Sequence, residues 1–342
     1  MSGDKVPYHL RQNKFVDRQL FIDVLSHVNR VRPIKDYLYV SFGGAYLEDF
    51  KIVHASFGNE EMLSLEQEPW LIERQKFNAP YGCIECINKT SAQFLEDYDE
   101  IVAEYRSESV IVWFDYAAPI QTRQINEYQA LLQHMKPFDI VRLTLNANPN
   151  TLAEEQRQVP PEPAEQLRER RFQELRHRLG DFLPAGFSAD DMRPDSYARL
   201  LLGCIRLASL QALAGTPDLL VQPLAVFTYN DAVHQMLTVT SIVLERNHIA
   251  EFLGDTGLNR YEFASTDWER VVPIKLPYLS AREKLYLDAL LFKNTHRRQR
   301  SQLRAGTKLK VRLAKTPADS REMVSQYLLF YRYYPHYHRI QY

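Results

Sequence analysis

Apolar residues in the first half of the chain alternate between two spacings. Continuous apolar runs at 37–42, 61–66, 83–88, 110–114 and 138–145 are typical of strands that are buried on both faces. Between the runs, apolar residues recur every three or four positions, as they do on one face of a helix. The predicted helices of this region are 46–56, 69–77, 92–99 and 121–134. Strands that alternate with helices predict a doubly wound, mostly parallel α/β sheet of the Rossmann-like type.

The pattern changes after the fifth strand. A helix is predicted over 196–214, with Asp195 as its N-cap. Two β-rich runs follow at 222–231 and 234–243, separated by a short polar turn. Such a pair predicts an antiparallel hairpin, which we expect to close the sheet.

The same patterns divide the chain into parts. Apolar residues of 14–30 share one helical face, so residues 1–35 are predicted to be a helical lead-in. The Rossmann-like domain is predicted over 36–250, with a charged insert at 146–193 that forms a solvated helix or a lid. Residues 251–342 are predicted to be an α-rich appendage.

Composition limits the class of protein. The chain has 342 residues and a formal net charge of −1, so no global field favours nucleic acid or a membrane as partner. No apolar run approaches the ~18 residues of a membrane span, and the first residues lack the apolar core of a signal peptide. Three cysteines argue against a disulfide framework. We therefore expect a cytoplasmic protein without a membrane partner.

Two motifs resemble metal or redox sites. Cys83 and Cys86 form a C-x-x-C pattern, and His336 and His338 lie near the C-terminus. The cysteines fall in a predicted strand, where positions three apart face opposite sides, and no second ligand pair completes four-coordinate zinc. We predict no metal site.

The most informative candidate site joins the first two strands. Gly43 and Gly44 follow the first strand, and Glu66, at the end of the second, comes 22 positions after Gly44. A βαβ unit that grips a ribose places its carboxylate about 20 residues after the glycine turn. The glycines let the backbone approach a ligand, and Glu66 can accept hydrogen bonds from a diol. A nucleoside-containing ligand is thus predicted; the alternative is a tight turn beside an ordinary surface glutamate.

Five βα units followed by a helix and a hairpin are also the order of elements in class I S-adenosylmethionine-dependent methyltransferases, which the motifs over residues 35–245 resemble. Ser41–Ala45 is similar to the family's glycine loop, Met62–Glu66 to its second strand, and Ile111–Tyr116 to its fourth motif. Within that class the chain most resembles bacterial proteins named putative O-methyltransferases. The resemblance implies S-adenosylmethionine as cofactor, held by Phe42, Gly43, Gly44, Ala45, Glu66, Thr90, Ser91 and Asp115.

The resemblance also places a catalytic pair after the fourth strand. Methyl transfer is an in-line displacement, so alignment supplies much of the catalysis. Asp115 is expected to orient or deprotonate an acceptor hydroxyl, with Tyr116 as its neighbour. The alternative is that Asp115 only caps the next helix. Residues 115–119 lack the Asp/Asn-Pro-Pro-aromatic motif of enzymes that methylate exocyclic amines, so we expect transfer to oxygen.

Lys14, Asp17 and Arg18 form a charged cluster on the leading helix. Lys14 and Arg18 are candidates for anchoring an anionic substrate. The alternative is that the three charges are exposed and form ordinary surface salt bridges.

A second hypothesis takes the departures from the family pattern into account. The family has an acidic residue where this chain has Ser41 and a third glycine where it has Ala45, and bulky Tyr46 follows. These residues suit a degenerate methyltransferase fold that serves as a scaffold or sensor in a bacterial multi-subunit complex, for example one associated with defence or nucleic acid.

The C-terminal stretch 293–342 is rich in lysine, arginine and tyrosine, and such a stretch can bind nucleic acid. Its alternative is a solvated basic helix followed by an aromatic helix that packs on the core. A third hypothesis is a nicotinamide oxidoreductase, but such an enzyme needs a pyrophosphate-binding turn that this chain lacks.

Overall fold

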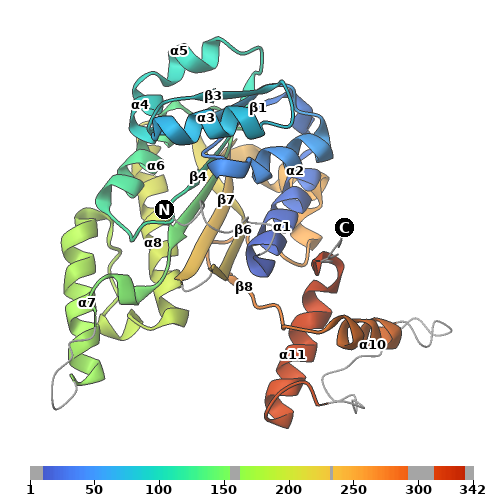
Figure 1. Ribbon diagram of the computed structural model, residues 1–342. Helices are drawn as coiled ribbons and strands as arrows, with labels where there is room; N and C mark the ends of the chain where they lie inside the picture. Colours follow the sequence, from blue (N-terminus) through green and yellow to red (C-terminus); the bar gives the residue numbers. More distant parts are fainter. Residues whose placement is uncertain (1–10, 155–161, 232–233, 292–311, 336–342) are drawn as a thin grey trace.

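The computed structural model describes residues 11–154, 162–231, 234–291 and 312–335. Its centre is one eight-stranded sheet with the strand order β3-β2-β1-β4-β5-β7-β6-β8 (Figure 1). The strands are β1 (Tyr37–Ser41), β2 (Met62–Leu65), β3 (Ile84–Ile87), β4 (Ser109–Asp115), β5 (Ile140–Asn146), β6 (Leu219–Asp231), β7 (His234–Glu245) and β8 (Val272–Ile274).

The first five strands are parallel, and the sixth and seventh form a hairpin. β7 lies between β5 and β6 and is antiparallel to both. The predicted doubly wound sheet with a closing antiparallel hairpin is thereby confirmed. All five parallel strands direct their carboxyl ends to one edge, which is where open α/β sheets bind ligands.

Helices cover both faces of the sheet (Figure 1). One face packs against α4 (Ser91–Glu96), α5 (Tyr98–Ala103), α6 (Thr122–His134), α7 (Ala164–Leu179) and α8 (Pro194–Ala212). The other packs against α1 (Gln12–Val28), α2 (Glu48–Phe57), α3 (Pro69–Asn78) and α9 (Ile249–Thr256), while α10 (Ala281–Leu291) and α11 (Pro317–Phe330) stand apart from the sheet in Figure 1 and contribute residues to the same apolar cluster. Side chains alternate along β4, so the strand contributes to the apolar core on each face of the sheet. Val112 and Phe114 face the first set of helices, and Ile111 and Trp113 face the second.

Two local predictions were wrong, and one strand was missed. The helix expected over 92–99 is two short helices, α4 and α5, and Thr90 caps the first with a capping box. Asp195 is not the N-cap of α8, because Pro194, whose fixed φ suits the first helical position, starts the helix and Arg193 precedes it. The short strand β8, which pairs with β6, had not been predicted at all.

The insert and the C-terminal part are both packed. Leu175 and Leu179 of α7 are buried in the first core, and Tyr327 and Phe330 of α11 are buried in the second. The alternative of an aromatic helix packed on the core therefore describes α11. The basic residues of 293–311 lie outside the described residues, as do 336–342. The division of the chain into lead-in, domain and appendage stays a prediction.

Candidate functional site

The glycine turn lies at the carboxyl end of β1. Gly43 and Gly44 both adopt left-handed backbone conformations, with φ of +65° and +57°. The turn is tight, since the Gly44 amide donates to the carbonyl of Phe42 at 2.7 Å. A Cβ atom on Gly43 would lie 2.5 Å from Leu47 Cδ2 and 2.7 Å from Ser64 Oγ. A side chain here would force Leu47 and Ser64 to shift and would be strained at positive φ, so both packing and conformation favour glycine.

Helix α3 holds the turn from one side. The buried Gln75 donates from Nε2 to the carbonyls of Phe42 and Gly44, both at 3.0 Å. Ser64 Oγ donates to Gln75 Oε1 at 3.0 Å, which fixes the orientation of the amide. Asn78 Nδ2 donates to the carbonyl of Ala45 at 2.7 Å. The sequence analysis missed Gln75, although its polar side chain on the buried face of α3, beside Leu71, is a signal.

Glu66 lies at the same edge, directly after β2, which pairs with β1. Its side chain is half-buried, and Oε1 accepts a hydrogen bond from the Glu68 amide at 2.8 Å. The Glu66 carbonyl accepts from Asn88 Nδ2 at 2.7 Å, which ties the ends of β2 and β3 together. The structure thus brings the predicted carboxylate and the predicted glycine turn to neighbouring strand ends.

The predicted polar contacts after β3 and β4 converge on a residue that the sequence analysis missed. Glu127, on α6, is buried, and its Oε2 accepts from Ser91 Oγ at 2.6 Å and from the Tyr116 hydroxyl. Burial, together with the Glu127 carboxylate, holds the pKa of Tyr116 well above its usual value. Tyr116 is therefore a protonated donor. Thr90 does not join this cluster, because its side chain caps α4.

The ring of Phe42, in the loop after β1, packs against aromatic rings at the end of β4. Its centroid lies 5.6 Å from that of Phe114, in a stacked arrangement, and 5.5 Å from that of Tyr116. Aromatic pairs at such separations stabilise packing beyond the burial of area. The loop after β1 and the loop after β4 are thus held against each other.

Asp115 faces the opposite side of β4 from Tyr116 and contacts α1. Its Oδ2 lies 3.0 Å from Nζ of Lys14, whose side chain is only 3% exposed. Lys14 also lies 3.7 Å from Asp231, whose two carboxylate oxygens both accept from Nη1 of Arg11, at 2.7 and 2.8 Å. The start of α1 is therefore bound to the carboxyl ends of β4 and β6.

The charges around Asp115 decide its protonation. Burial opposes ionisation, but the Lys14 ammonium at hydrogen-bond distance outweighs it, with help from Arg18 and Arg142, so the pKa lies below the usual value for aspartate. An ionised carboxylate with a low pKa is a good hydrogen-bond acceptor and a weak base. Its other oxygen, Oδ1, is buried and has no hydrogen-bond partner among the described residues.

A second buried pair lies behind the first. Asp17 Oδ1 is 2.6 Å from Nη2 of Arg142, and both side chains are fully buried. Arg142 also lies 4.6 Å from the ring centroids of both Phe21 and Trp113. The alternative of salt bridges describes Lys14 and Asp17, but these pairs are not at an exposed surface, since Lys14, Asp17 and Arg18 are at most 4% exposed. Lys14 and Asp17 form buried ion pairs because α1 packs these positions against charges on the sheet, and Arg18 lies over the ring of Trp113.

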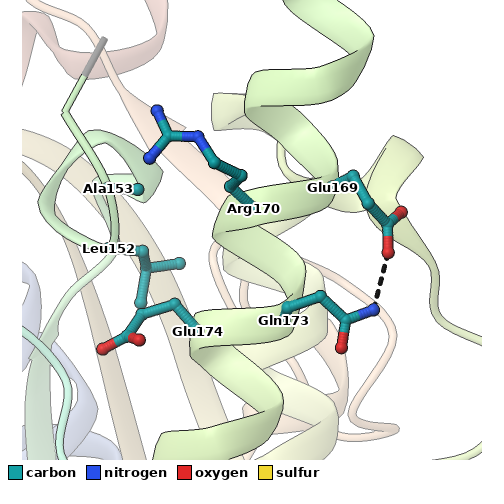
Figure 2. Close-up of a pocket in the computed structure, with 6 residues that line it drawn as sticks. All are labelled: Leu152, Ala153, Glu169, Arg170, Gln173 and Glu174. Carbon is teal, nitrogen blue, oxygen red and sulfur yellow. Dashed lines mark hydrogen bonds between the residues drawn. The ribbon is translucent and has the colours of Figure 1, made fainter. Parts of the chain in front are cut away.

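No other site of the predicted kinds is found in the part of the chain that the structure describes. No group of three potential metal ligands occurs there, and Cys83 and Cys86 are free thiols. None of the described helices is long and apolar enough to cross a membrane. An open depression of about 540 Å³ lies beside α7, lined by Leu152 and Arg170 among others (Figure 2). It contains none of the predicted site residues.

Strand order and site together define the class of protein. A sheet ordered 3-2-1-4-5-7-6 with a reversed seventh strand, and with its glycine turn and acidic residue on β1 and β2, is the class I methyltransferase fold. The chain belongs to the family described as "Putative O-methyltransferase", whose model matches residues 6–342.

Solved structures with a similar fold are distant. Trm1 from Pyrococcus horikoshii, in complex with S-adenosyl-L-methionine, has 12% identity and a TM-score of 0.40 over 67% of this chain and 56% of that one. The O-methyltransferase from Bacillus cereus, in complex with SAH, has 10% identity and a TM-score of 0.38 over 71% of this chain and 84% of that one. No curated protein matches the sequence.

Proposed function

We propose that this protein is an S-adenosylmethionine-dependent methyltransferase that transfers the methyl group to an oxygen atom of its acceptor. The observation that supports it most is the convergence of Gly43, Gly44 and Glu66 at adjacent carboxyl ends of β1 and β2. Membership in the O-methyltransferase family supports the same assignment. Fold alone would not, because the same architecture carries many functions.

The residues at this edge fit the cofactor. Gly44 can bring its backbone close to the donor without a Cβ in the way, while Gly43 lets the turn pack on Leu47 and Ser64, and the half-buried Glu66 carboxylate suits the ribose hydroxyls. Thr90, Ser91 and Phe42 are the candidates for the wall around the base. When bound, the cofactor supplies an activated methyl group on a sulfonium.

Asp115 is proposed to orient the acceptor. Its buried Oδ1 lacks a partner among the described residues, and an unsatisfied buried acceptor costs about 1–3 kcal/mol. The Asp115 side chain is 17% exposed, so a small rotation of the carboxylate would let a hydroxyl of the acceptor satisfy this oxygen. The low pKa of Asp115 favours alignment of that hydroxyl over its deprotonation. Tyr116, held as a donor to Glu127, is proposed to keep the neighbouring backbone in place.

Isothermal titration with S-adenosylmethionine tests the proposal. We expect heat of binding in the wild type and an affinity at least ~10-fold lower in Glu66→Ala, because loss of one hydrogen bond to a charged group costs about 1.5–3 kcal/mol. Glu68→Ala is the matched control, since Glu68 is exposed and donates its backbone amide, not its side chain, to Glu66. No heat at millimolar donor, or equal affinity in Glu66→Ala, would contradict it.

A second candidate, a non-catalytic binding protein on this fold, has one observation in its favour. The groups expected to act are already engaged within the protein, since Asp115 pairs with Lys14 and Tyr116 donates to Glu127. If the protein binds the donor but transfers no methyl to any of a panel of hydroxyl acceptors, including its co-purifying partners, this candidate is favoured. Transfer to any acceptor excludes it.

A further inference from the structure

One face of α8 lies beside a groove that the methyltransferase proposal does not use. The loop 183–187 and the segment 266–270 form its other walls, and its volume is about 410 Å³. Pockets of about 300–1,000 Å³ are typical of small-molecule sites. The apolar lining consists of Pro184, Phe187, Leu202, Leu207, Leu210 and Trp268.

The α8 side of the groove is a single stripe. Arg199, Gly203, Arg206 and Leu210 follow one another at spacings of three or four residues, so they share a helical face. Glycine within a helix costs about 1 kcal/mol relative to alanine. A Cβ on Gly203 would lie 3.2 Å from Phe187 Cε2, so the missing side chain lets the loop approach the helix.

The opposite wall carries a strained tryptophan. Trp268 has φ of +63°, a conformation that costs a bulky residue roughly 1–2 kcal/mol. The Asp267 carboxylate holds the turn, since its Oδ1 accepts from the amides of Glu269 and Arg270 at 3.0 and 3.3 Å. Strained backbone that neighbouring contacts maintain is typical of functional positions.

The rim of the groove carries net positive charge. Arg199 makes no hydrogen bond or ion pair with any residue that the structure describes. Arg206 lies 3.6 Å from Glu269, but both side chains are more than half exposed, and such surface pairs contribute little. An arginine beside an apolar surface complements a molecule that has an apolar body and a carboxylate, which the guanidinium binds in a bidentate manner.

We propose that this groove binds a small amphipathic carboxylate. Arg199 receives the carboxylate, and the apolar body lies over Leu207, Leu210 and Trp268. The site is on the face of the sheet opposite to α1, so it is separate from the Lys14–Asp115 pair and does not depend on methyl transfer.

Calorimetry with decanoate tests the proposal, with decanol as the uncharged probe of equal chain length. We expect decanoate to bind the wild type, and Arg199→Gln to weaken binding about 10-fold, as expected for the loss of a charged hydrogen bond. Leu210→Glu, a change at a residue that is 56% exposed, should abolish binding by placing a carboxylate in the groove. Arg176→Gln, at an exposed arginine of α7 outside the groove, should change nothing.

Tryptophan fluorescence tests whether decanoate binds in the groove. Trp268 is the tryptophan that lines the groove, so decanoate should alter the emission of the wild type and not that of Trp268→Phe, which should still bind by calorimetry. The proposal is overturned if decanoate does not bind, if decanol binds as tightly, if Arg199→Gln binds normally, or if the fluorescence response survives in Trp268→Phe.

Discussion

At the scale of single residues, Gly43 shows how the glycine turn constrains its sequence. Its φ of +65° and the 2.5 Å contact that a Cβ would make with Leu47 both disfavour any other residue. Gly58 isolates the cost of positive φ, since its φ is +76° and a Cβ added to Gly58 would have no atom within 4 Å. We expect Gly58→Ala to lower the free energy of unfolding by about 1 kcal/mol.

Gly43→Ala should cost more, about 2–4 kcal/mol, because overpacking adds about 1–3 kcal/mol to the backbone cost. Urea unfolding of the two variants and the wild type measures the difference. If both variants lost the same free energy, the neighbours of Gly43 would be able to move apart, and the requirement for glycine would be one of conformation alone.

Lys14 and Asp115 make a prediction about pH. Replacing Lys14 by Met removes the ammonium that offsets burial, so the pKa of Asp115 should rise, as carbon-13 NMR of labelled aspartate would show. At pH 7 the free energy of unfolding should fall by about 3 kcal/mol, because one charge of a buried pair is left alone. Lys14→Arg keeps the charge and should retain most of the stability.

The sign of the pH dependence follows from the lowered pKa. A carboxylate whose pKa is lower in the folded state than in the unfolded state stabilises the fold above the unfolded value, about 3.9. That stabilisation is lost as the pH falls through the folded value. Because the unfolded state is common to both proteins, the difference between wild type and Lys14→Met should shrink as the pH falls from the raised pKa of Asp115 in the variant to its lowered pKa in the wild type. A difference that stayed constant down to pH 2 would mean that lost packing, and not charge, is responsible.

At the scale of elements, a buried ion pair fixes α1 on the sheet. Arg142→Met leaves Asp17 buried without its cation and should cost about 3–5 kcal/mol. The double variant Asp17→Leu, Arg142→Met removes both charges, and it should recover most of that loss. Denaturant unfolding of the wild type, both single variants and the double variant forms a double-mutant cycle. Losses that simply add would show that the two charges do not stabilise each other.

The elements themselves were largely predictable, and the reasons are local. Seven strands are continuous apolar runs or β-rich runs, and turn or capping residues separate them from the helices. β8 has only three residues and contains Pro273, so neither length nor propensity distinguishes it. The break between α4 and α5 depends on one residue, Asp97, whose backbone leaves the helical region.

The site was predictable only where its spacing along the chain is fixed. The βαβ unit determines how far Glu66 follows Gly44, so the sequence indicates both. Gln75, Glu127 and Arg142 act on partners that packing brings together from other elements. A single sequence shows such residues only as polar positions on apolar faces. The same limitation explains why the burial of the α1 charges was not predicted.

At the scale of the whole molecule, the C-terminal helices share one apolar cluster with helices that cover the sheet. Tyr327 and Phe330 of α11 are fully buried in the same apolar cluster as residues of α1 and α9, and Phe330 stacks on Phe263 with ring centroids 5.4 Å apart. The Tyr333 hydroxyl also donates to Asp23 of α1. A shared core of this kind favours cooperative unfolding of the lead-in, the sheet and the C-terminal part.

Phe330→Ala tests that cooperativity. Truncation of a buried phenylalanine costs about 3–5 kcal/mol, and in a shared core the whole protein should lose it, so the single thermal transition should move to lower temperature. Leu285→Ala on α10 is the control, because that side chain is 68% exposed and its removal should leave the transition in place. Two transitions, of which only one responds to Phe330→Ala, would instead show that residues 251–342 unfold as a separate appendage.

Near-ultraviolet circular dichroism distinguishes the two outcomes, because it reports on tyrosine and tryptophan throughout the chain. In the cooperative case, Trp113 in β4 and Tyr327 in α11 lose their fixed environments at the same temperature.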